Sequence, residues 1–210
     1  MRLNWFAAFA MLAFDAFAGS SVELHEPSFY GTGCSNRTAD VSISKDAKRI
    51  DISFERFYVE ADSDTTAGKA ANKECEAIIG FKAPHGKAVA VQQIRYHGDY
   101  NLPFGSNAHI SGTHYFNGEE LESVSKRFFG HTESSLELVI TIPYYALTWA
   151  PCGVDVELRS VTKLAVSAKK SLNKASFQVD GQPAEGQPER GGISYDLIWR
   201  SCESSILRDE

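Results

Sequence analysis

The sequence lacks the short motifs that mark the common enzyme mechanisms. It contains no G-x-S-x-G nucleophile elbow, no H-E-x-x-H zinc motif, no phosphate-binding P-loop and no dinucleotide-binding glycine fingerprint. Asp and Glu are plentiful, but their spacing singles out no pair as glycosidase carboxylates. We therefore predict no catalytic residue and no cofactor. The pattern favours a protein that binds over one that catalyses.

Clustered positive charge is also scarce. The chain has 21 Lys and Arg against 27 Asp and Glu, which gives a formal net charge of -6. Nucleic acids and anionic membranes are bound through clustered Lys and Arg, so this balance argues against either as a partner. One cluster of basic residues occurs, and it consists of Lys163, Lys169, Lys170 and Lys174. We interpret this basic cluster as a solvated face.

Long apolar runs are confined to the N-terminus. Residues 5–14 are apolar, follow Arg2, and precede Ala16-Phe17-Ala18, which fits the small-x-small rule for signal cleavage. This run is too short to cross a bilayer as a helix. We predict a signal peptide at residues 1–18, a mature chain without a membrane span, and a secreted or periplasmic location. The alternative is a buried amphipathic first helix.

Four cysteines are the strongest positive signal: Cys34, Cys75, Cys152 and Cys202. In an exported chain, an even number of cysteines without a C-x-x-C pair indicates disulfides rather than a zinc or redox site. Four cysteines permit three pairings. We favour Cys34 with Cys75 and Cys152 with Cys202, because each bond then closes a loop within one half of the chain.

Apolar and polar residues alternate with the period of two that is typical of β-strands, and long helical periodicity is almost absent. Residues 50–54 alternate, and the pattern resumes at Phe57 after a one-residue slip that predicts a bulge. About ten such short segments, separated by Gly, Pro, Asn and Asp, predict an all-β fold. We expect a single antiparallel β-sandwich, Ig-like or jelly-roll-like, at residues 33–210, with residues 19–32 as an N-terminal extension.

A ligand site is predicted in the segment 99–105. This segment places Tyr100 and Phe104 beside the turn-forming Pro103 and Gly105. Exposed rings at a sheet edge suit stacking on sugars or packing on a partner surface. The alternative is that the rings plug an open end of the sandwich. Two polar segments, 61–74 and 181–192, are the other loops in which a site could lie.

His97 and Asp99 are added to this site because residues two apart share one face of a strand. They could act as two metal ligands, but the sequence shows no third ligand nearby, so we predict no metal site. His109 and His114 are five apart and are expected to face opposite sides of a strand. The predicted ligand-binding residues are His97, Asp99, Tyr100 and Phe104.

The motifs around the cysteines carry a family resemblance. They are Gly33-Cys34, Lys73-Glu74-Cys75, Pro84-His85-Gly86, Tyr96-His97-Gly98, Trp149-Ala150-Pro151-Cys152-Gly153 and Leu197-Ile198-Trp199-Arg200-Ser201-Cys202. Over residues 33–202 the chain resembles a secreted family of bacteria and fungi catalogued as domain of unknown function 4360. The resemblance implies export, paired cysteines and an all-β domain. It implies no catalytic residues.

Two tryptophans stand three residues before a cysteine. Trp149 and Trp199 each lie within an apolar alternating run, so we predict that both anchor the core near Cys152 and Cys202. The alternative is a surface binding role for either ring. The favoured function is a non-enzymatic exported module that binds a carbohydrate, an envelope component or a protein. The alternatives are an extracellular hydrolase and a structural envelope or coat protein. A deep pocket with clustered acids would favour the hydrolase, a flat aromatic face the binding module, and a long unpaired edge strand the structural protein.

Overall fold

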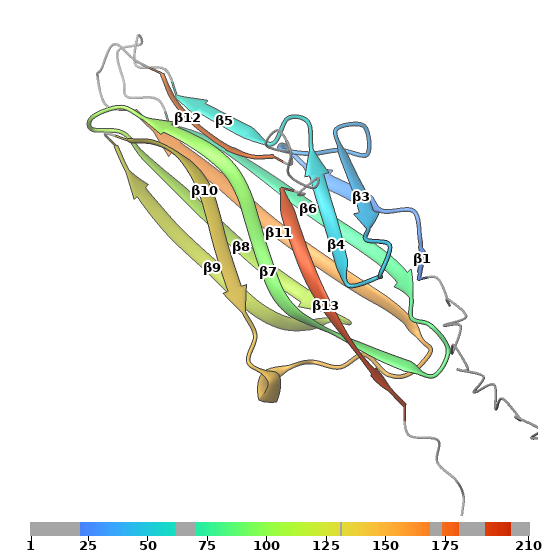
Figure 1. Cartoon of the computed structure of the whole chain (residues 1–210). Helices are drawn as coiled ribbons and strands as arrows, with labels where there is room; N and C mark the ends of the chain where they lie inside the picture. Colours follow the sequence, from blue (N-terminus) through green and yellow to red (C-terminus); the bar gives the residue numbers. More distant parts are fainter. Residues whose placement is uncertain (1–21, 62–69, 131, 169–173, 181–191, 203–210) are drawn as a thin grey trace, which may run out of the picture.

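Two antiparallel β-sheets pack face to face (Figure 1). The structure is a computed structural model that describes residues 22–61, 70–130, 132–168, 174–180 and 192–202. The predicted signal peptide, most of the polar segments 61–74 and 181–192, and part of the basic cluster lie outside these residues. No helix in the described chain is long and apolar enough to cross a membrane.

The first sheet is built on the long strand β6. Two short strands pair with β6 in succession, and both come from the segment expected to be an N-terminal extension. Residues 23–24 and 28–31 are therefore part of the sheet. Its strands are β1 (Glu23–Leu24), β2 (Ser28–Gly31), β6 (Ala70–Lys82), β11 (Asp155–Ser167), β8 (Asn107–Phe116) and β9 (Glu119–Phe129).

The second sheet is organised around β7, its longest strand. One edge of β7 pairs with β10, and the other edge pairs first with β13 and then with β12. Beyond these, β4 pairs with β13 and β5 pairs with β12. The strands are β3 (Ala39–Ile43), β4 (Arg49–Phe54), β5 (Tyr58–Ala61), β7 (Lys87–Leu102), β10 (Thr132–Thr141), β12 (Ala175–Val179) and β13 (Ile193–Ser201).

These observations confirm the predicted fold class. The chain forms an all-β antiparallel sandwich, and the interruption between β4 and β5 at residues 55–57 corresponds to the predicted slip. Side chains that face the opposite sheet form the core, and Ile79, Phe81 and Phe177 are fully buried in it. Burial of each such side chain contributes roughly 1.5–3 kcal/mol.

Both predicted disulfides are confirmed. Cys34–Cys75 joins the segment after β2 to β6, and both cysteines are buried. Cys152–Cys202 joins the segment before β11 to the residue that follows β13. The Cys34–Cys75 bond therefore fixes the segment after β2 to the first sheet, and the Cys152–Cys202 bond fixes the end of β13.

A chain of polar side chains crosses the core between the sheets. The two nitrogens of His114, on β8, contact the hydroxyls of Tyr96 and Tyr195 on the second sheet, at 2.7 and 2.8 Å. The Tyr96 hydroxyl also lies 3.3 Å from Thr162 Oγ1. Burial lowers the pKa of His114 to about 3 and raises the pKa of both tyrosines. His114 is therefore a neutral ring that donates one hydrogen bond and accepts another.

Gly112 leaves the space that the Tyr96 hydroxyl needs. An added Cβ would collide with that hydroxyl and lie 3.2 Å from Val124 Cγ1. Because the hydroxyl is held by hydrogen bonds, Gly112→Ala is expected to destabilise the fold by about 1–3 kcal/mol, measured by urea denaturation. Gly80→Ala is the matched control, since its methyl group meets the half-exposed His25 side chain. Equal stabilities of the two variants would contradict this role of Gly112.

Candidate functional site

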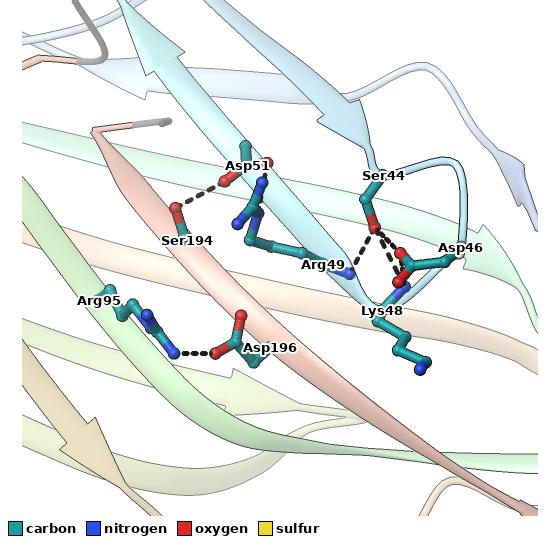
Figure 2. A network of polar contacts seen from close by, with 8 residues as sticks. All are labelled: Ser44, Asp46, Lys48, Arg49, Asp51, Arg95, Ser194 and Asp196. Atoms are coloured by element: carbon teal, nitrogen blue, oxygen red, sulfur yellow. Dashed lines mark hydrogen bonds and ion pairs between the residues drawn. The ribbon is translucent and has the colours of Figure 1, made fainter. Parts of the chain in front are cut away.

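Charged side chains on the outer face of the second sheet pair with one another (Figure 2). Asp51 accepts hydrogen bonds from Arg49 Nε at 3.1 Å and from the Ser194 hydroxyl at 2.6 Å. Arg95 and Asp196 form an ion pair across β7 and β13. These contacts cross-link three strands, and the charge of each Arg and Asp is balanced by a partner in the same sheet. The turn before β4 is closed similarly by Ser44, Asp46 and Lys48.

Two of the predicted site residues extend this outer face. His97 and Asp99 alternate with inward-facing residues of β7, and their register partners on β10 are Glu137 and Ser135. Asp99 is exposed. It lines an open polar groove of about 440 Å³ between β7, β10 and β12. In the described chain, no three His, Cys, Asp or Glu residues are grouped to hold a metal ion.

The two predicted aromatic residues lie apart from each other. Tyr100 packs between the sheets, with ring centroids 4.9 Å from Phe128 and 6.3 Å from Phe177. Phe104 lies in the turn after β7 and is 80% exposed. The structure thus divides the predicted site among an outer sheet face, the interior and a turn. For Tyr100, the geometry matches the alternative in which a ring plugs the end of the sandwich.

A second aromatic cluster, absent from the predicted site, lies at the other end of β10. The strand is followed by Pro143 and the short 3-10 helix η1 (Tyr144–Ala146), visible below β10 in Figure 1. Tyr144 is 71% and Tyr145 91% exposed. Tyr144 meets Trp149 edge-on at 6.3 Å between ring centroids. We call Tyr144, Tyr145 and Trp149 the aromatic turn.

One contact closes the aromatic turn, and three more join it to the two sheets. Within it, Ala146 N–H donates to the Pro143 carbonyl at 2.8 Å. The Thr148 hydroxyl donates to Glu119 of β9 at 3.2 Å. Ala150 N–H donates to the Val89 carbonyl of β7 at 2.8 Å. The fourth is the Cys152–Cys202 disulfide. These contacts place the exposed rings on a segment with fixed ends.

Trp149 differs from the prediction, whereas Trp199 agrees with it. Trp199 packs against the core, and its indole N–H donates to the Ala47 carbonyl at 2.8 Å. Trp149 is half-buried outside the core cluster, and the Arg200 guanidinium lies over its ring, 4.2 Å from the centroid. The reason is that Pro143 follows the end of β10, so the residues after it no longer alternate toward the core.

Comparison with known proteins places the chain in a family. The family model for a domain of unknown function, DUF4360, matches residues 20–202, which include both disulfides and the aromatic turn. The chain belongs to the DUF4360 family. The resemblance stated from the cysteine motifs is therefore confirmed, and the DUF4360 match extends it to residue 20. No curated protein sequence matches the chain.

One solved structure similar to this DUF4360 protein is TmCBM61 in complex with β-1,4-galactotriose. The two share 10% sequence identity with a TM-score of 0.28, and the match covers 85% of this chain and 90% of the other. A similarity of that size carries no argument about ligand or site.

Proposed function

We propose that this protein is an exported, non-enzymatic module that binds carbohydrate through the aromatic turn. The observation that carries the proposal is the pair of exposed rings, Tyr144 and Tyr145, next to the half-buried Trp149. Aromatic faces combine a large apolar area with a polar edge, which suits the apolar face and hydroxyl rim of a sugar ring. Rings buried for stability alone would not be left this exposed to water.

The fixed ends of the aromatic turn support the same proposal. A binding surface that is already ordered loses little conformational freedom when a ligand arrives. The contacts of Thr148 with Glu119 and of Ala150 with Val89 provide this order before any ligand is bound. Export is part of the proposal because structural disulfides persist in oxidising compartments.

Truncation of the exposed rings tests the site. Tyr145→Ala and Tyr144→Ala are each expected to weaken glycan binding by about 1–3 kcal/mol, that is, roughly 5- to 150-fold in Kd, because each removes a stacking surface. The melting temperature should change little, since neither ring is buried. The measurement is isothermal titration calorimetry with soluble polysaccharides that the unmodified protein binds.

Two control variants make this test specific. Tyr30→Ala removes another exposed tyrosine, on β2 of the first sheet, and should leave binding unchanged. Phe104→Ala tests the turn predicted from the sequence. If Phe104→Ala weakens binding and Tyr145→Ala does not, the site lies around residues 97–104 and the proposal for the aromatic turn is wrong.

A further inference from the structure

Arg200 is an exposed cation at the aromatic turn with no acidic partner in the described chain. Arg49, Arg95 and Arg159, on the sheet faces, each pair with a carboxylate. Within the described residues, no Asp or Glu oxygen lies within ion-pair distance of Arg200. The carbon of its guanidinium instead lies over the Trp149 ring, 4.2 Å from the ring centroid.

The fold brings these two side chains together across β7. Arg200 is the register partner of Ala88 on one edge of β7, while Ala150 N–H bonds to Val89 on the other edge. Ala88 carries only a methyl group, so nothing large separates the two sides. A cation–π contact holds one face of the guanidinium and leaves its N–H edges available.

A second cation, Lys87 at the start of β7, lies beside the end of β13, on the sheet face opposite to that of Arg200 because successive strand residues alternate in direction. Lys87 pairs in register with Ser201, and its ammonium donates to the Ser201 hydroxyl at 3.0 Å. The end of β13 therefore carries positive charge in a protein whose net charge is -6. A guanidinium with free N–H edges binds a carboxylate through two parallel hydrogen bonds, which neutral hydroxyls cannot replace at equal strength.

We propose that the aromatic turn selects an acidic polysaccharide, with Arg200 binding a sugar carboxylate while Tyr144 and Tyr145 stack on the sugar rings. This inference rests on the proposed function and names its ligand class, a uronate-bearing chain. The apolar and charged contacts have separate roles. The rings supply affinity for any sugar, and Arg200 supplies the preference for a negative charge.

Polygalacturonate and its methyl ester form the matched ligand pair, because they share a backbone and differ in charge. We expect the complete exported protein to bind polygalacturonate at least about tenfold more tightly than the ester in calcium-free buffer. Arg200→Gln should bring that ratio close to one while binding to the ester persists. Arg200→Lys should retain part of the ratio, since it keeps the charge but loses the planar fork. Arg37→Gln, at an exposed arginine in the segment before β3, should leave the ratio unchanged.

The outcomes separate this inference from the proposed function. Equal binding of both polymers, still lost in Tyr145→Ala, would overturn the inference and leave the proposed function standing. An unchanged ratio in both Arg200→Gln and Arg200→Lys would overturn the role of Arg200. If neither these polymers nor neutral glycans bind, both proposals fail. Melting curves of the two Arg200 variants check that the fold is retained.

Discussion

Lowering the pH from 6.5 to 4.5 is expected to cost the folded protein about 2 kcal/mol through His114 alone. Burial between the sheets holds the pKa of this imidazole at about 3, against an ordinary value of 6.5. Between these values the unfolded chain binds a proton that the folded chain does not bind. The stability that the neutral His114 ring contributes is therefore fully present above pH 6.5, and it is lost as the pH falls from 6.5 toward 3.

Urea denaturation at the two pH values measures this effect. In His114→Gln the side chain no longer titrates, so its stability should depend less steeply on pH than that of the unmodified protein. The variant should also be less stable at pH 6.5, because the hydroxyls of Tyr96 and Tyr195 lose a shared partner. His109→Gln is the control: His109 lies on the same strand but contacts Ser125 near the surface. An unchanged pH dependence of stability in His114→Gln would contradict the claim that His114 causes the loss of stability between pH 6.5 and pH 4.5.

If His114→Gln does not fold, the unmodified protein still provides the test. The imidazole C–H resonance of His114 should show no titration between pH 8 and pH 4.5 in the folded state. A midpoint near 6.5 for that resonance would show that the ring is hydrated, contrary to its position between Tyr96 and Tyr195.

Removal of either disulfide is expected to destabilise the protein by about 4 kcal/mol in the chain-entropy model. The paired cysteines are 41 and 50 residues apart, so the two loops contribute similarly. Replacing Cys34 and Cys75 by Ala should cost more, because that bond is buried in the core. Chemical denaturation of the two double variants measures the difference.

The same two variants are expected to differ in binding. Cys152 lies three residues after Trp149, and its bond to Cys202 fixes one end of the aromatic turn. The Cys152→Ala/Cys202→Ala variant should therefore bind glycans more weakly at a temperature where it is fully folded. The Cys34→Ala/Cys75→Ala variant should bind normally under the same condition. Equal binding by both variants would show that the disulfide does not order the aromatic turn.

Alternation along the sequence was enough to predict the sandwich, because strands with a period of two must bury one face. The same rule places Tyr100. Tyr96, Gly98, Tyr100 and Leu102 are two residues apart on β7 and all face inward. Pro103 and Gly105 favour a loop at residues 99–105, but β7 continues to Leu102.

Other features depend on contacts that no single segment reveals. The chain from Tyr96 through His114 to Tyr195 requires the register of three strands from two sheets. The apolar run that contains Trp149 predicts a core position for its ring. Pro143 and two adjacent tyrosines directly after an alternating strand were the signal that the strand ends there and that exposed rings follow.

The indole N–H resonances of Trp149 and Trp199 give the most direct test of the binding site. These are the two tryptophans of a chain without residues 1–18. On addition of polygalacturonate, the Trp149 resonance should shift, because its ring lies beside Tyr144 and Arg200. The Trp199 resonance should stay unchanged, because its N–H is bonded to the Ala47 carbonyl. Saturation of the protein with a glycan while the Trp149 resonance does not move would contradict binding at the aromatic turn.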